Sequence, residues 1–174
     1  MNNYKAVGAG ILFLLGATFG AFAQDKPTDP QIAHIAYTAG VIDIEAAKQA
    51  LSKSTNKTVT DFAQLMVNDH QAVNDQALEL VGKLGVKPED NATSQALVKA
   101  AEEKRAELAR LEGAAFDKAY VSNEIAYHKR VNAALETLLI PSAQNAELKS
   151  LLETGLKLFQ AHQQHAEHLG AELK

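Results

Sequence analysis

Residues 59–84 read VTDFAQLMVNDHQAVNDQALELVGKL, and this stretch decides the fold. Its apolar side chains recur every three or four residues, which is the period of an α-helix with one buried face. They are Phe62, Met66, Val73, Ala77, Leu80 and Leu84. Gly85 and then Pro88 follow, and both residue types are typical of a helix end. The stretch therefore predicts a helix of roughly 26 residues, about 39 Å long at 1.5 Å per residue, with Thr58 or Thr60 as its N-terminal cap.

The same spacing recurs on both sides of this stretch. Thr28-Asp29-Pro30 is a typical helix start, because a capping residue precedes a first-turn proline. No segment alternates apolar and polar residues over a length that predicts a strand. The sequence thus predicts an all-α protein. Its other helices are expected from Asp29 to the break at 54–56, from residues 91–94 to about Glu112, from Gly113 to just before Pro141, and from about Ser142 to the C-terminus.

The lengths of the connections restrict how these helices are arranged. The first and second helices are joined by a few residues, as are the fourth and fifth, so each pair is expected to form an antiparallel hairpin. The connection from Gly85 to Gly113 is long enough to run back along a whole helix. We therefore expect a ferritin-like four-helix bundle with one long crossover that carries a short extra helix.

Composition excludes several functions. The 174-residue chain has a formal charge of −4, which argues against binding to nucleic acid, since that function needs a basic surface. It has no cysteine, so disulfides, thiolate metal sites and cysteine nucleophiles are ruled out. The glycine-rich phosphate loops and the serine and zinc-protease motifs are also missing.

The N-terminal residues resemble a secretory signal peptide. Lys5 precedes an apolar run from Ala6 to Phe19, and Ala21-Phe22-Ala23 is a typical cleavage site. We expect residues 1–23 to be removed, so that a domain over 24–174 reaches the periplasm. The alternative is an uncleaved membrane anchor. No later stretch of the sequence is apolar enough to cross a membrane.

Three histidines lie on the apolar faces of three different predicted helices. These are His70, His128 and His162, and imidazole is a common metal ligand that helical bundles often direct inward. Glu124 lies one turn before His128, Glu45 lies at the edge of the first apolar face, and Asp69 adjoins His70. His165 follows in a histidine-rich tract, QAHQQHAEH, that also includes His168. We predict a metal centre at the three histidines, with Glu45 and Glu124 as the nearest acids and with Asp69 and His165 as secondary candidates.

A metal-free interpretation is also open. A buried histidine is usually satisfied by a tyrosine, an acid or a backbone carbonyl, and Tyr37, Tyr120 and Tyr127 are available for this. The diiron pattern of paired Glu-x-x-His motifs is absent, because Val67 and Phe159 stand three residues before His70 and His162.

The order of these residues resembles a known family of exported bacterial proteins. Phe62-Ala63 and Met66-Val67 before Asp69-His70 match its first motif, and Gly113 to Phe116-Asp117 with Tyr120 and His128 match its second. Leu156 to His162 match its third, with Lys157 in place of the usual proline. The family is domain of unknown function 4142, and the resemblance covers about residues 30–173. It implies a ferritin-like fold and export, it implies that the motif histidines are His70, His128 and His162, and it implies an acidic position in the first helix at Asp43 or Glu45.

Two functions from different classes follow. The first is a periplasmic metal-binding protein for envelope metal handling or defence against oxidative stress. Its nitrogen and oxygen ligands would suit iron, zinc, manganese or copper(II). The second is a metal-free structural or partner-binding module with a hydrogen-bonded polar core. A small hydrolase or oxidase is a third, weaker hypothesis, and the sequence identifies no reaction, protein partner or oligomeric state.

Overall fold

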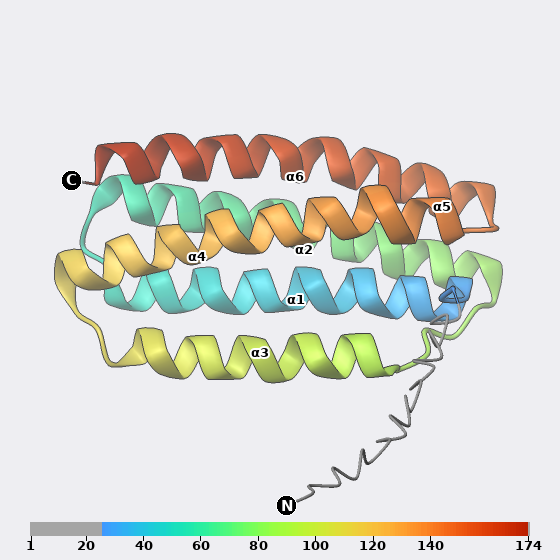
Figure 1. The fold of residues 1–174 in the computed structure, drawn as a ribbon. Helices are drawn as coiled ribbons and strands as arrows, with labels where there is room; N and C mark the ends of the chain where they lie inside the picture. Colours follow the sequence, from blue (N-terminus) through green and yellow to red (C-terminus); the bar gives the residue numbers. More distant parts are fainter. Residues whose placement is uncertain (1–25, 174) are drawn as a thin grey trace, which may run out of the picture.

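The computed structural model describes residues 26–173, and these form five long helices and no strand (Figure 1). The helices are α1 (Asp29–Lys53), α2 (Lys57–Leu84), α3 (Ala92–Ala109), α4 (Gly113–Ala134) and α6 (Ala146–Glu172). The all-α prediction is confirmed for this part of the chain. The expected signal peptide, residues 1–23, lies outside the described residues. Among the helices of 26–173, none is long and apolar enough to cross a membrane.

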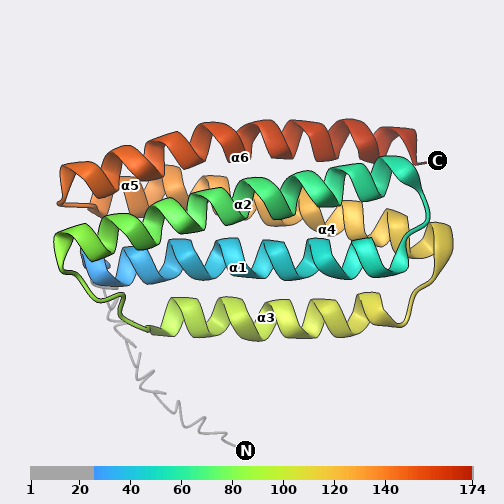
Figure 2. The same cartoon turned by 180° about the vertical axis from the view of Figure 1, so that it is seen from behind.

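The long helices form two antiparallel hairpins, α1 with α2 and α4 with α6 (Figures 1 and 2). α3 connects the hairpins and packs along the outer side of α1, so the long connection does run back along the bundle. As a result, α2 and α4 run in the same direction, as the hairpin analysis predicts (Figure 1). Side chains from four helices can therefore meet in the interior between α1, α2, α4 and α6.

Short polar side chains begin several of these helices. The backbone N–H of Thr28 donates to Gln31 Oε1 at 3.1 Å at the start of α1. Asn91 Oδ1 accepts from two backbone N–H groups at the start of α3. At the start of α2 the cap is Asn56, whose Oδ1 accepts from the Thr58 N–H at 3.0 Å, so the expectation that Thr58 or Thr60 caps this helix is wrong. Gly85 ends α2 in the left-handed conformation, with φ of 64°, as expected from its residue type.

The predicted end of the fourth helix before Pro141 is also wrong. α4 continues through a π-helical turn, η1 (Leu135–Leu139), into the short α5 (Ile140–Ser142). The Ile140 N–H donates to the Leu135 carbonyl, one residue further back than in an α-helix. Pro141 has no N–H to donate, and it directly follows the π-turn, where the hydrogen bonds of the helix are shifted by one residue. The other differences are smaller, since α3 ends at Ala109 and α6 begins at Ala146, where Asn145 provides the cap.

The hydrophobic core is divided into two clusters. We call one the aromatic cluster, because it contains Phe62, Phe116 and Tyr120 together with Met66, Leu108, Val59, Val121, Leu169 and several alanines. The other, the aliphatic cluster, consists of Ile32, Ile35, Leu135, Leu139, Ala143, Leu148 and Leu152. Along α1, Asp43 lies between Ile35 of the aliphatic cluster and Ala46 of the aromatic cluster. A buried polar layer thus separates the two clusters.

Candidate metal centre

Five ionisable side chains from four helices meet in this polar layer. None of them is more than 3% exposed. They are Asp43 of α1, His70 of α2, Glu124 and His128 of α4, and His162 of α6. The three imidazole rings lie 5.4–5.7 Å apart between centroids. His70, His128 and His162 each offer one ligand atom within 4.8 Å of the others, and so do Asp43, Glu124 and His128.

His128 has its ligating nitrogen fixed by the backbone. Its Nδ1 lies 3.0 Å from the Glu124 carbonyl oxygen, one turn earlier in α4. A carbonyl oxygen only accepts, so Nδ1 carries the proton and donates, and Nε2 keeps its lone pair. Nε2 lies 3.7 Å from Asp43 Oδ2 and has no hydrogen-bond partner among the described residues. This nitrogen is therefore free to bind an ion at the centre.

His162 is oriented in the opposite sense by a carboxylate. Its Nε2 lies 2.8 Å from Oδ2 of Asp69, a half-buried residue of α2. The carboxylate accepts from Nε2–H, which leaves the lone pair on Nδ1. That Nδ1 is buried and has no partner within 26–173. A carboxylate that holds the far nitrogen of a histidine is the usual support of a metal-binding imidazole.

His70 is positioned by stacking and not by a hydrogen bond. Its ring lies on the Phe159 ring at 4.7 Å between centroids, with an angle of only 7° between the planes. Its Nε2 is 3.6 Å from Asp43 Oδ2, too far for a hydrogen bond. Neither ring nitrogen has a partner in the described part of the chain. The flat contact with Phe159 fixes the plane of the ring while both nitrogens stay available.

Burial disfavours the charged form of each side chain in the centre when no ion is bound. Desolvation raises the pKa of Asp43 to about 7, although its interaction with Glu124 opposes the rise. The pKa of Glu124 is raised well above its usual value by burial and by the nearby Asp43 carboxylate. Burial lowers the pKa of His128 to about 4, and it lowers the pKa values of His70 and His162 as well. The three imidazoles are thus uncharged at neutral pH, which is the form that binds metals.

The donor atoms are spaced closely enough for one ion. Two ligand atoms bound at about 2.1 Å lie at most about 4.2 Å apart across a metal. The ligand atoms of His70, His128 and His162 lie within 4.8 Å of one another, and so do those of Asp43, Glu124 and His128, so small side-chain rotations can close either group around an ion. His128 belongs to both groups and joins them. The donor set of imidazole nitrogens and carboxylate oxygens suits a transition metal. These residues fit such an ion.

The residues of the centre lie in the part of the chain that matches a known protein family. A family model described as "Domain of unknown function (DUF4142)" matches residues 17–169 of the chain. The chain belongs to this family. The DUF4142 match includes all five side chains of the centre. No curated protein and no solved structure matches the chain.

Within this DUF4142 chain, the predicted convergence of the three histidines is confirmed as geometry. Glu124 also reaches the centre, but Glu45 does not. Glu45 pairs with Arg105 of α3 at the protein surface. Two residues along a helix turn by about 200°, so Asp43 and Glu45 lie on opposite faces of α1. Asp43, which the family resemblance left as an alternative to Glu45, occupies the inner position.

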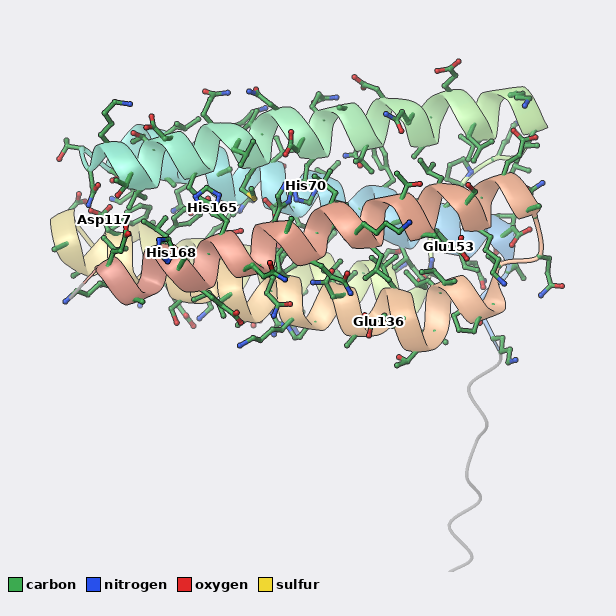
Figure 3. All side chains as sticks on the ribbon, turned by 90° about the horizontal axis from the view of Figure 1, so that it is seen from above. His70, Asp117, Glu136, Glu153, His165 and His168 are labelled. Carbon is green, nitrogen blue, oxygen red and sulfur yellow. The ribbon has the colours of Figure 1, made fainter. Side chains whose placement is uncertain are left out.

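The secondary candidates have different outcomes. Asp69 contacts His162 of α6 and not its neighbour His70. His165 is exposed and its ring lies against Phe62, and His168 pairs with Glu172 at the surface. Figure 3 shows both residues nearer the C-terminal end of α6 than His70 is. The histidine-rich tract therefore supplies only His162 to the centre.

Some contacts of this DUF4142 centre could not be predicted from the sequence pattern. Phe159 lies on the apolar face of its helix, but nothing in the pattern indicates that it stacks on His70. The tyrosines suggested as partners for the histidines do not act as such. Tyr127 donates to the Ala39 carbonyl at 2.8 Å, and the Tyr120 hydroxyl has no partner within 26–173.

Proposed function

We propose that this DUF4142 protein binds one transition-metal ion between four of its long helices, α1, α2, α4 and α6. The observation that carries the proposal is a set of eight buried nitrogen and oxygen atoms without a hydrogen-bond partner in residues 26–173. They belong to Asp43, His70, Glu124, His128 and His162. Buried polar atoms that lack partners cost free energy, and a single ion would satisfy several of them at once.

Each side chain has a distinct part in holding the ion. His128 through Nε2, His162 through Nδ1 and His70 supply neutral nitrogens, and Asp43 supplies a negative oxygen. Glu124 lies within reach as a further ligand or as a proton acceptor beside the ion. Asp69 and the Glu124 carbonyl hold two of the imidazoles in the required orientation. A bound ion would supply Lewis-acid or redox chemistry at this buried position.

Several broader features belong to the same proposal. The two hairpins and the long crossover support a ferritin-like fold. The N-terminal sequence supports a signal peptide at residues 1–23 and a periplasmic location. Nitrogen and oxygen donors without sulfur suit iron, zinc, manganese or copper(II). A periplasmic protein with such a centre would serve envelope metal handling or defence against oxidative stress.

The metal-free alternative predicts a hydrogen-bonded polar core, and the contacts support it less well. Within the described residues, the carboxyls of Asp43 and Glu124 interact with each other, and the three imidazoles make two hydrogen bonds. One joins His128 to the Glu124 carbonyl and the other joins His162 to Asp69. Both bonds leave the second ring nitrogen available to an ion.

Metal titration of the chelator-treated protein tests the proposal. We expect calorimetry and elemental analysis to find one ion per chain. Replacing His70, His128 or His162 with Ala should weaken binding at least tenfold, because each change removes a ligand. Asp69→Asn should weaken it about 10–100-fold, because the change removes the support of His162. His34→Ala and His165→Ala are matched controls and should bind like the wild type.

Two results would contradict the proposal. One is a wild-type protein that takes up none of the four metals, in which case the polar core is structural. The other is equal loss of binding in the control variants, which would place the ion outside the centre.

A further inference from the structure

A cavity of about 450 Å³ opens beside the candidate metal centre. Asp43, His70, Glu124 and His128 form part of its wall. The rest of the wall is mostly apolar and comes from all five long helices and η1. Protein interiors contain few voids larger than a water molecule, so a cavity of this volume is a specific feature of the fold. Volumes of this size are typical of ligand sites.

The cavity belongs mainly to one half of the bundle. It extends from the centre through the half that contains the aliphatic cluster, where Ile35, Leu135 and Leu152 line it. None of the three aromatic residues of the aromatic cluster lines it. Large rings therefore fill one side of the polar layer, while the other side is left open.

Small side chains and a helix irregularity create this space. The residues that line it include Ala39, Ala101, Ala134 and Gly155. A Cβ added at Gly155 would meet the Phe159 ring at 3.4 Å, an ordinary contact, so close packing does not require glycine there. Glycine within a helix is destabilising relative to alanine, and here it leaves room in the cavity. Leu135, Leu138 and Leu139 of the π-turn line the same space, and such turns are frequent at functional sites.

The cavity has a polar part at the candidate metal centre and a longer apolar part. Its lining residues on α1 extend from Ala33 to Ala46, and the apolar part from Ala33 to Asp43 spans about 15 Å at 1.5 Å per residue. Leu138 is 40% exposed, and exposed residues of α3 such as Glu103 and Glu107 also line it, so the cavity reaches the surface at η1 and along α3. In its polar part the carboxyl oxygens of Asp43 and Glu124 are buried and have no hydrogen-bond partner in the described structure. An apolar space of this length that ends at a group of potential ligands fits one alkyl chain with a ligating head group.

We propose that the cavity binds a single-chain fatty acid, with its alkyl chain along the apolar wall and its carboxylate at the metal ion. This proposal rests on the proposed function, because the ion must offset the negative charge of Asp43 beside a second carboxylate. Three imidazoles and Asp43 would give an ion four ligands, and zinc accepts one more oxygen by expanding to five-coordination. A fatty acid supplies that oxygen together with an apolar chain for the aliphatic half.

Dodecanoic acid is a suitable probe, because its extended chain is comparable in length to the lined part of α1. We expect calorimetry to show that it binds the zinc-loaded protein at least tenfold more tightly than the metal-free protein. Its methyl ester, which has no anionic head group, should show no such dependence on zinc. Gly155→Leu should weaken dodecanoate binding at least tenfold, because the new side chain fills the cavity, while the zinc content stays unchanged.

Gly82→Leu is the matched control, since Gly82 lies on an exposed part of α2 where an added Cβ meets nothing within 4 Å. It should change neither zinc nor dodecanoate binding. Ala134→Leu is a second cavity-filling variant, should Gly155→Leu fail to fold as judged by its helical content.

Dodecanoate binding that is independent of zinc, or unchanged in both filling variants, would overturn the fatty-acid site. A wild type that takes up neither zinc nor any of the other three metals would overturn the proposed function and the metal-bound head group together. Normal zinc binding without dodecanoate binding overturns the fatty-acid site alone.

Discussion

The carboxyl group of Asp43 costs the metal-free protein stability once it ionises. Its pKa is about 7 in the folded chain, against about 3.8 for an exposed aspartate. Between these values the folded state binds more protons, so the contribution of this group to stability falls as the pH rises from about 4 through about 7. A carboxylate that binds an ion at neutral pH is therefore a burden when the ion is absent.

Replacing Asp43 with Asn should expose this cost. We compare the free energies of unfolding of the two proteins in the presence of a chelator. The stability of Asp43→Asn relative to the wild type should increase by on the order of 2–4 kcal/mol when the pH is raised from 5 to 8, because the amide does not ionise. Urea unfolding of both proteins at the two pH values measures the difference. Burial lowers the pKa values of His70, His128 and His162, which also makes stability depend on pH, but these residues are present in both proteins. If the free energy of unfolding depends on pH in the same way in Asp43→Asn and in the wild type, the pKa of Asp43 is not raised by burial.

Single residues also show how far the sequence could predict the centre. Helical periodicity placed His70, His128 and His162 on inner faces, because the position of a side chain around its own helix is a local property. The choice between Asp43 and Glu45 depended on where the inner face of α1 begins, which the sequence left open by one or two residues. The contact of Asp69 with His162 joins two helices that are far apart in sequence, so no local pattern could reveal it.

At the scale of the helices, the end of α2 depends on one backbone conformation. Gly85 has φ of 64°, which L side chains rarely adopt, although no atom would obstruct a Cβ there. Gly85→Ala should therefore destabilise the protein by about 1 kcal/mol through backbone strain alone. Gly82→Ala, three residues earlier within the helix, should stabilise it by about 0.5–1 kcal/mol. Thermal unfolding of the two variants checks the pair, and equal shifts in the same direction would refute this account.

The π-turn shows why helix ends were harder to predict than helix faces. Proline usually ends a helix, and Pro141 was expected to do so. The chain instead shifts its hydrogen bonds by one residue at Leu135–Leu139 and continues to Ser142. This choice depends on packing of the aliphatic cluster, to which Leu135 and Leu139 belong. It is a tertiary effect, and propensity does not encode it.

At the scale of the whole molecule, the proposed ion would connect both hairpins. Its candidate ligands come from α1, α2, α4 and α6, whereas α3 supplies none. A ligand that binds only the folded state stabilises it by RT ln(1 + [L]/Kd), about 4 kcal/mol at a thousandfold excess over Kd. That stabilisation should be greatest where the ion holds helices together.

Hydrogen exchange with and without zinc tests this distribution. Zinc should slow amide exchange near Asp43, His70, His128 and His162, on α1, α2, α4 and α6, and should leave α3 nearly unchanged. Adding dodecanoic acid to the zinc-loaded protein should then slow exchange in α3 as well, because Leu97 and Ala101 line the cavity. Zinc protection confined to α4 and α6 would place the ion within one hairpin, away from Asp43 and His70. If zinc alone protects α3 as much as the other helices, the ion stabilises the whole fold and does not bind at the centre between α1, α2, α4 and α6.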